Sequence, residues 1–304
     1  MMAAAPDGLS HEPAGHPLLP LALVLGVLAV STAAIFIKLC DDAPAVVIAA
    51  ARLGIASVLL VPGAAAVRGR RLFDIPLACV KHVLLAGVFL ALHFLLWIAS
   101  LKHTSVLSSV VIVTTNPIFV GIMSFLLFKE RVGRRLVAAI VIAAIGGALI
   151  ALSDVGATGG SLYGDGLALG GAVMASCYFL VGRKLRRDLH VLSYITPVYA
   201  TTAVILVAIA LLTGLSFAGY APATYLYFVL LAVGPQLIGH GSLNFSLRYV
   251  TATVVAIVLL GEPIGSSILA YFFLDERVTV LQIFGGVLIL AGIFLAARTP
   301  SPTT

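Results

Sequence analysis

Charged side chains are scarce in this sequence. Asp, Glu, Lys and Arg make up 10% of its 304 residues, whereas about a quarter of the residues in a soluble globular domain are charged. Cysteine occurs three times and tryptophan once. The cysteines lie in or beside apolar segments without the spacing of a metal or redox site, so we expect no disulfide framework and no metal. The composition therefore excludes an ordinary soluble globule.

Catalytic and nucleotide-binding motifs are also missing. The sequence has no P-loop, no HExxH pair and no nucleophile elbow. We therefore expect no cofactor, no ATP-driven pump and no enzyme, with an integral-membrane enzyme as the less favoured alternative. The net charge of +6 could indicate nucleic-acid binding. The basic residues, however, lie in short loops between apolar runs, which is typical of a membrane protein and not of a nucleic-acid partner.

Long apolar runs fill most of the chain. Hydrophobic residues make up 61% of it, and the mean hydropathy is +1.16. A transmembrane helix needs about 20 mostly apolar residues. We expect a disordered cytoplasmic tail at residues 1–17 and a second cytoplasmic tail at 299–304. The sequence predicts an all-α integral membrane fold with ten transmembrane helices, at 18–39, 44–67, 78–101, 105–128, 134–153, 164–184, 192–214, 224–247, 250–274 and 278–298.

The distribution of Lys and Arg predicts the orientation. If the N-terminus is inside, the inner loops hold fourteen basic residues and the outer loops three. Cytoplasmic loops carry such an excess, so we expect a multi-pass protein of the plasma (inner) membrane with both termini in the cytoplasm. The outer three are Lys38, Lys102 and Arg277, and the inner ones are Arg68, Arg70, Arg71, Lys81, Lys129, Arg131, Arg134, Arg135, Arg183, Lys184, Arg186, Arg187, Arg248 and Arg298.

One pattern occurs twice, 146 positions apart. Asn116-Pro117 is followed by Lys129-Glu130-Arg131, and Glu262-Pro263 is followed by Asp275-Glu276-Arg277. Two five-span units, at 18–153 and 164–298, account for this spacing. Because five is odd, the second unit enters the membrane from the opposite side. Inverted repeats with broken helices are typical of secondary transporters, whose substrate site lies near the membrane midplane.

These stretches resemble the drug/metabolite transporter superfamily of the EamA type. The best-matching segments run from Asn116-Pro-Ile-Phe-Val to Lys129-Glu-Arg-Val and from Glu262-Pro-Ile to Asp275-Glu-Arg-Val-Thr, and the glycine-rich fifth and tenth spans match as well. Arg52 matches an arginine often found in the second span of this family. The resemblance covers residues 18 to 298 and is specific for the fold and for solute transport, but not for the substrate.

The resemblance implies a basket of helices around a central cavity, lined mainly by spans 1, 3, 4, 6, 8 and 9. It further implies alternating-access transport of small organic solutes such as amino acids or other metabolites, as an exporter. The expected partners are a small-molecule solute and the lipid bilayer, with proton coupling as a possibility, and a monomer or a homodimer as the assembly. The competing interpretation is a channel or facilitator without ion coupling.

Glu262 is the sharpest candidate for chemistry. It lies in the middle of the ninth predicted span, where an unpaired carboxylate is costly and should face a cavity or a partner. Pro263 cannot donate to the Leu259 carbonyl, so another group must satisfy that oxygen. We favour a cation or proton site over the alternative, a protonated Glu262 that locks the kink by bonding to a neighbouring helix.

Asn116 is the counterpart of Glu262 in the first half, and Pro117 leaves the Val113 carbonyl without its usual donor. Two readings carry equal weight: the amide binds a polar solute, or it satisfies that carbonyl.

Two helical faces carry further polar groups. Gln236, His240 and Asn244 follow one another at intervals of four, which favours a cavity lining over the alternative of contacts between helices. His93 and Trp97 have the same interval and predict an aromatic wall for flat or cationic solutes, with core or lipid-facing packing as the alternative.

Arg52 lies about a third of the way into the second predicted span. One interpretation lets it extend to the outer surface. The other pairs it with Asp41, Asp42 or Glu262.

Overall fold

The structure is a computed structural model that describes residues 16–72, 74–128, 134–155, 162–250 and 252–297. Within these ranges the regular elements are helices and there is no strand, which confirms the all-helical prediction. Most of the predicted tail at 1–17, the Lys129-Glu130-Arg131 motif and the tail at 299–304 lie outside the described residues.

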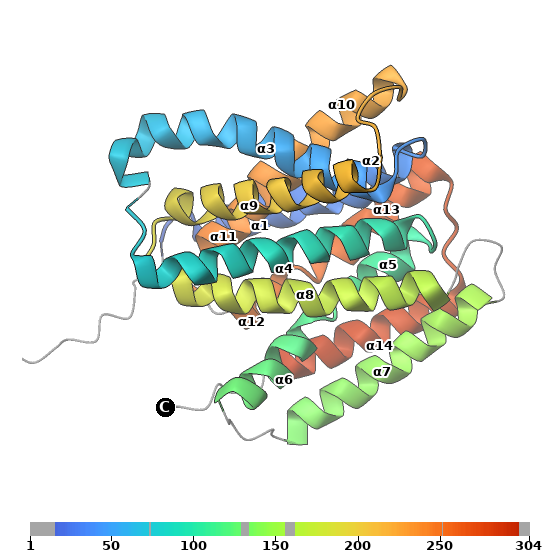
Figure 1. Ribbon diagram of the computed structural model, residues 1–304. Helices are drawn as coiled ribbons and strands as arrows, with labels where there is room; N and C mark the ends of the chain where they lie inside the picture. The colour runs from blue at the N-terminus through green and yellow to red at the C-terminus, as the bar shows by residue number, and fades with distance from the viewer. Residues whose placement is uncertain (1–15, 73, 129–133, 156–161, 251, 298–304) are drawn as a thin grey trace, which may run out of the picture.

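The helices follow one another with short connections (Figure 1). The first half contains α1 (Leu19–Ser31), α2 (Ala33–Leu39), α3 (Ala45–Arg68), the 3-10 helix η1 (Gly69–Leu72), α4 (Leu77–Leu101), α5 (Val106–Val113), α6 (Asn116–Phe128) and α7 (Arg134–Val155). The second half contains α8 (Leu162–Arg186), α9 (Val191–Leu212), α10 (Pro222–Leu231), the π-helix η2 (Ala232–His240), α11 (Gly241–Ser246), α12 (Ala252–Val258), α13 (Gly261–Leu274) and α14 (Val280–Ala297).

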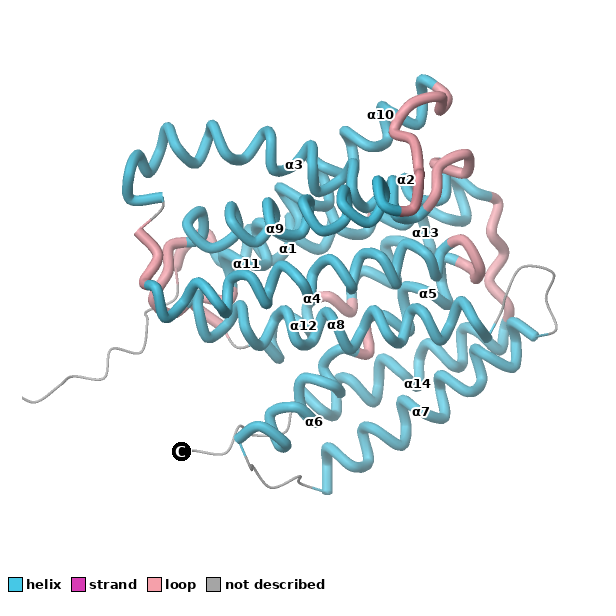
Figure 2. The backbone as a smooth tube through the Cα atoms, in the orientation of Figure 1, coloured by secondary structure: helices cyan, strands magenta, loops and turns pink. Residues whose placement is uncertain are grey.

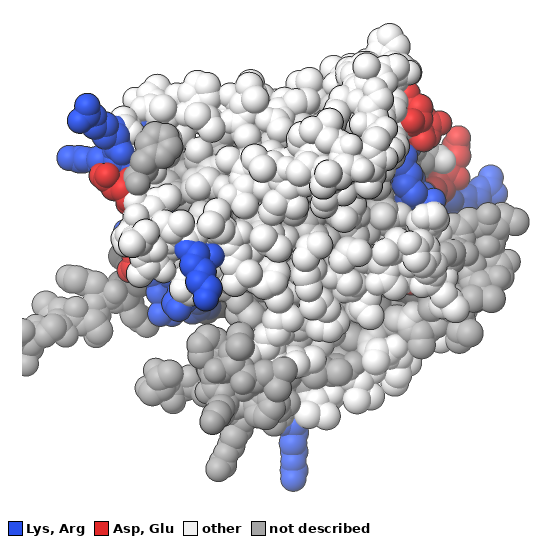
Figure 3. Space-filling model, viewed as in Figure 1, with Lys and Arg blue, Asp and Glu red and all other residues white. Residues whose placement is uncertain are grey.

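The described residues contain 8 helices long and apolar enough to cross a membrane. They correspond to the predicted spans one to four and six to nine. At the remaining two positions, α7 and α14 carry shorter apolar stretches, Val137–Gly147 and Val280–Gly292. Eight candidate spans are therefore found, and the figure of ten stays a prediction. Figure 3 shows that, on this face, the coloured charged side chains gather toward the ends of the bundle and the surface between them carries almost none, as expected of helices that lie in a bilayer.

Two of the spans are broken near their middle, and Figure 2 shows the breaks as short loops inside the bundle. The first break separates α5 from α6 at Thr114-Thr115, and the second separates α12 from α13 at Leu259-Leu260. Each break precedes its proline. The prolines therefore lie in the first turn of α6 and of α13, where the helix needs no N–H donor from them.

The second break satisfies its own backbone. The Leu259 carbonyl accepts a hydrogen bond from the backbone N–H of Glu262, at 2.9 Å. The prediction that this oxygen needs a donor from elsewhere is therefore wrong, because the chain turns before Pro263 instead of bending around it.

The 146-residue repeat of the sequence is also found in the contacts between α7 and α14. A Cβ atom added to Gly146 would lie 2.5 Å from the Gly285 carbonyl oxygen, and one added to Gly292 would lie 2.7 Å from the Ala139 carbonyl oxygen. Both pairs of equivalent positions, 146 with 292 and 139 with 285, differ by the 146 residues found in the sequence. The two contacts are thus symmetry mates, and the glycines allow the two backbones to approach closely.

Other helix contacts follow the same repeat, because each contact is found again between the equivalent helices of the two halves. Helix α3 packs against its own counterpart α9, and α4 packs against α8 as η2 packs against α1. The broken spans also meet, because α5 contacts α13. The two helix breaks therefore lie in the interior of the bundle, between the two halves.

Candidate functional site

A central cavity of about 40 Å³ lies beside the two helix breaks. It has room for a few water molecules, each of which needs roughly 10–15 Å³, and it is far smaller than the ~300–1,000 Å³ typical of small-molecule sites. The cavity in this conformation is therefore too small for an organic solute, and the helices around it must rearrange before a solute can enter. Six of the predicted site residues line this cavity, namely Arg52, His93, Trp97, Asn116, His240 and Glu262.

Glu262 lies in the first turn of α13 and is 7% exposed. Its carboxylate makes no hydrogen bond or ion pair with any described residue. A kink lock would need a bond to a neighbouring helix, and none is found in the described part of the chain. The geometry thus favours the interpretation in which Glu262 faces the cavity.

Arg52 lies in α3 and is completely buried, so the interpretation that it extends to the outer surface is wrong. Its Nε donates to Oε1 of Gln236 at 2.9 Å, and its guanidinium carbon lies 4.1 Å from the centroid of the Phe94 ring. Nη1 and Nη2 have no hydrogen-bond partner among the residues that the structure describes. The alternative, a pairing with Asp41, Asp42 or Glu262, is not formed as a salt bridge among the described residues. Glu262 nevertheless lines the same cavity and interacts with Arg52 electrostatically.

The aromatic wall comes from α4 and η2. The rings of His93 and Trp97 stack with centroids 6.0 Å apart and an angle of 6° between their planes. Nδ1 of His93 lies 3.0 Å from the Gly171 carbonyl oxygen and must donate to it. The Trp97 indole N–H and Nδ1 of His240 have no partner. The wall therefore combines a fixed flat surface with polar atoms that are free to bind a solute.

Asn116 opens α6 and is 4% exposed, with Oδ1 unpartnered. It makes no bond to the Val113 carbonyl. The last turn of α5 uses hydroxyl groups instead: Thr114 donates to the carbonyls of Val110 and Val111, and Thr115 donates to that of Ile112. The threonines thus stabilise the end of α5 through other carbonyls than that of Val113, and Asn116 lines the cavity.

The three polar residues predicted to share one face of span eight, Gln236, His240 and Asn244, have three different roles. Gln236 is occupied by Arg52, and His240 lines the cavity. Asn244 lies behind the wall, where Nδ2 is 2.7 Å from the Tyr178 hydroxyl and donates to the His240 carbonyl at 2.7 Å. The expectation that Gln236 and Asn244 line the cavity is therefore wrong. Residues 232–240 form a π-helix, in which an interval of four no longer returns to the same face.

Two further residues that line the cavity, Phe179 and Thr114, were not singled out from the sequence. Tyr178 also lines the cavity and is 1% exposed. The glycine-rich α8 carries Tyr178 and Phe179, and its side chains gave no periodic polar signal in the sequence. The described residues contain no group of three His, Cys, Asp or Glu side chains that could hold a metal ion.

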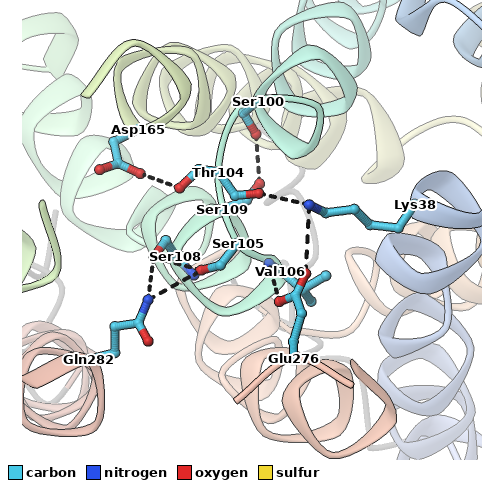
Figure 4. A network of polar contacts seen from close by, with 10 residues as sticks. All are labelled: Lys38, Ser100, Thr104, Ser105, Val106, Ser108, Ser109, Asp165, Glu276 and Gln282. Carbon is cyan, nitrogen blue, oxygen red and sulfur yellow. Dashed lines mark hydrogen bonds and ion pairs between the residues drawn. The ribbon is translucent and has the colours of Figure 1, made fainter. Parts of the chain in front are cut away.

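A second group of polar side chains closes one end of the bundle (Figure 4). We name it the end cluster: Lys38, Ser100, Thr104, Ser105, Ser108, Ser109, Asp165, Glu276 and Gln282, with the backbone N–H of Val106. Lys38 lies 3.6 Å from Oε1 of Glu276 and donates to the Thr104 carbonyl at 2.9 Å. Oε2 of Glu276 accepts the Val106 N–H at 2.9 Å. The ion pair thus ties α2 and the start of α5 to the α13–α14 connection.

The rest of the end cluster continues these links between the halves. The Thr104 hydroxyl donates to Oδ1 of Asp165 at 3.0 Å. Nε2 of Gln282 lies 3.4 Å from the Ser105 hydroxyl and 3.3 Å from that of Ser108. At the same end, Asp42 accepts the backbone N–H of Ala221 at 2.8 Å and the hydroxyl of Thr224 at 2.7 Å, and so caps α10. Residues of the first half are thereby bonded to residues of the second across this end.

Comparisons with known proteins agree with this architecture. Residues 18–152 and 162–298 each match the EamA-like transporter family. The uncharacterized transporter YxxF of Bacillus subtilis (strain 168) is 24% identical over 220 residues, which cover 71% of this chain and 69% of that protein. The uncharacterized transporter YyaM of the same organism is 22% identical over 258 residues, which cover 82% and 83%.

A solved crystal structure shares the fold. It superposes with a TM-score of 0.68 at 18% sequence identity, covering 93% of this chain and 97% of its own.

Proposed function

The chain belongs to the EamA-like transporter family and is a multi-pass membrane transporter, and from this premise we propose that it is a secondary transporter. It moves small organic solutes, such as amino acids or other metabolites, across the plasma membrane by alternating access. Ten spans in two inverted halves carry the motion, both termini are cytoplasmic, and the direction is export. Family resemblance alone supports the direction.

The observation that carries this proposal is the set of unpartnered polar atoms around the central cavity. Arg52, Trp97, Asn116 and His240 each present a buried nitrogen or oxygen without a hydrogen bond. Buried polar atoms in proteins are normally bonded, and each one left without a partner costs about 1–3 kcal/mol. A polar solute that enters the cavity supplies the missing partners.

The proposed alternating access draws support from the size of the cavity and from the end cluster. A cavity of about 40 Å³ cannot hold an organic solute, so the halves must separate. The end cluster bonds the halves at one end, and its Lys38–Glu276 ion pair is only a quarter exposed. Under the proposed orientation this end faces outward, and opening it requires these bonds to break.

Glu262 is proposed to couple transport to protons or to bind a cationic group of the solute. It is an acid inside the membrane, where such residues mark ion or proton pathways. Because its carboxylate makes no hydrogen bond or salt bridge with the residues that the structure describes, it can take up a proton or a cation without first breaking such a contact.

Solute flux into proteoliposomes tests the proposal. A panel of amino acids, nucleobases and organic cations is offered with and without an imposed pH gradient. We expect uptake of one solute class that the gradient accelerates. Uptake that is indifferent to the gradient would instead indicate a facilitator and remove proton coupling, and no uptake of any member would contradict transport of these solutes. Protein-free liposomes are the control.

A further inference from the structure

Two arginines are buried in the described part of the chain, and they are held in opposite ways. Arg186 is 1% exposed and is bonded to the protein through Nε, which donates to the Asn244 carbonyl at 3.0 Å, and through Nη1, which donates to the Leu189 carbonyl. Arg52 is 0% exposed and uses Nε alone, while Nη1 and Nη2 are both unpartnered. Arg186 lies behind the cavity wall, whereas Arg52 lines the cavity. The difference indicates a structural role for the first and a ligand for the second.

The Arg52 guanidinium is fixed before any ligand arrives. Gln236 holds Nε from η2, and the face of Phe94 supports the planar group from α4. Guanidinium over an aromatic face is a favourable contact, and the Nε bond defines which edge is left without a hydrogen bond. That edge consists of the buried Nη1 and Nη2 atoms. The side chain is therefore preorganised, and little rotational freedom is lost when a ligand binds it.

We propose that Arg52 is the anchor for a carboxylate group of the transported solute. Two adjacent Nη atoms match the two oxygens of a carboxylate in a bidentate pair. This inference rests on the proposed function, since it takes the central cavity as the solute site. It narrows the solutes to those that carry a carboxylate and excludes nucleobases and organic cations without one.

Among the described residues, no carboxylate forms a salt bridge with this guanidinium, and Glu262 attracts it only from across the cavity. Gln236 provides a neutral acceptor, and Glu262 lines the same cavity without forming an ion pair with Arg52. A buried charge whose donors are unpaired is costly, so the cavity favours an anionic ligand at this place. Glu262, whose charge is opposite to that of Arg52, remains available for a proton or for a cationic group of the same solute.

The chain has a built-in reporter for this test. Trp97 is its one tryptophan, lines the cavity and has an unpartnered indole N–H. Its fluorescence in purified protein therefore measures binding without any transport. The probes are four acid–amide pairs: propionate with propionamide, alanine with alaninamide, leucine with leucinamide, and phenylalanine with phenylalaninamide. The members of a pair share their shape, but only the acid carries the carboxylate charge.

We expect at least one acid to change the Trp97 fluorescence saturably, and its amide to bind about tenfold more weakly or worse, the loss that follows from removing a charged hydrogen-bonded pair. Arg52→Gln should remove the preference for the acid, and Arg52→Lys should retain part of it, because the charge remains while the fork is lost. Arg186→Lys, a change at a buried arginine outside the cavity, should leave the preference intact.

Equal responses to acid and amide in the wild-type protein, or no response to any acid, would overturn the proposal. The proposal would also be overturned if chloride changed the Trp97 fluorescence and the acids did not compete with chloride for the site. The wild-type comparison decides the question even if Arg52→Gln does not fold. Acid binding that depends on Arg52, together with an absence of flux, would leave the anchor standing and contradict transport. Flux of solutes without a carboxylate, at an unchanged rate in Arg52→Lys, would support transport and contradict the anchor.

Discussion

The central cavity and the end cluster are both built from polar side chains inside an apolar bundle, yet their hydrogen bonding is opposite. In the end cluster, Lys38, Glu276 and Gln282 each have partners from distant parts of the chain. Around the cavity, Trp97 and Asn116 present atoms without any. A bonded cluster stabilises one arrangement of helices, while an unbonded one costs stability unless a ligand completes it. The contrast separates the contacts that hold this conformation from those that serve the solute.

The largest effect is expected at the carboxylate that has no bond to lose. Glu262→Gln preserves size and hydrogen bonding but removes the charge and the exchangeable proton. If Glu262 couples protons or binds a cation, flux should fall about tenfold or more, as the loss of a charged interaction worth about 1.5–3 kcal/mol requires, and its pH dependence should disappear. The measurement is initial uptake at several pH values. A normal rate with the wild-type pH profile would exclude this role.

Two asparagines give the sharpest form of the comparison. Asn244 is bonded to Tyr178 and to the His240 carbonyl, so Asn244→Ala should lower the free energy of unfolding by about 1–3 kcal/mol because it leaves buried groups unpaired. Asn116 has its Oδ1 unpartnered, so Asn116→Ala should reduce flux severalfold with little loss of stability. Thermal unfolding in detergent and uptake are measured for both variants. A larger stability loss in Asn116→Ala would assign Asn116 to the structural group.

The sequence predicted the framework of the molecule better than its polar contacts. Long apolar runs place the helices, and the 146-residue repeat reappears in the contacts of Gly146 and Gly292. These features depend on local composition and on internal similarity, which a sequence displays directly. The cavity position of Glu262 also followed, since few places can hold an acid inside a membrane.

Pairings between distant residues were beyond such patterns. Arg52 and Gln236 are 184 positions apart, and no periodicity joins them. The stripe of Gln236, His240 and Asn244 failed for a different reason, because the interval of four assumes an α-helix where the chain forms a π-helix. The end cluster was missed since its members belong to helix ends and connections, whose apposition depends on how the halves pack.

A smaller effect is expected from the ion pair of the end cluster. Lys38→Met and Glu276→Gln, alone and combined, form a double-mutant cycle. The coupling between the two side chains should be about 0.2–1 kcal/mol, the range for partly exposed ion pairs. Lys38→Met alone should cost more than Glu276→Gln, because methionine also loses the hydrogen bond to the Thr104 carbonyl, whereas glutamine keeps an oxygen that can accept the Val106 N–H at the start of α5. Unfolding in detergent measures all four proteins. Additive losses would show that the ion pair does not hold this end together.

The smallest effect is expected at Asp42, which joins the halves at the same end but is exposed. The backbone N–H of Ala221, followed by the Thr224 hydroxyl, lowers the pKa of the Asp42 carboxyl from its ordinary value. A lowered pKa in the folded protein means that ionised Asp42 adds stability above the ordinary carboxyl pKa, about 3.9. That contribution is lost as the pH falls through the lowered pKa.

Asp42→Asn separates this charge effect from hydrogen bonding, because asparagine resembles the protonated acid and still offers an acceptor to Ala221. The variant should therefore unfold at a lower temperature than the wild type at pH 7, and the two melting curves should converge in acid, where the wild-type carboxyl has taken up its proton. A difference that persists unchanged at low pH would assign the contribution of Asp42 to geometry alone. The Asp42 contact would then act like the neutral hydrogen bonds between Gln282 and the serines. Lys38–Glu276 would be left as the charged link between the halves at this end.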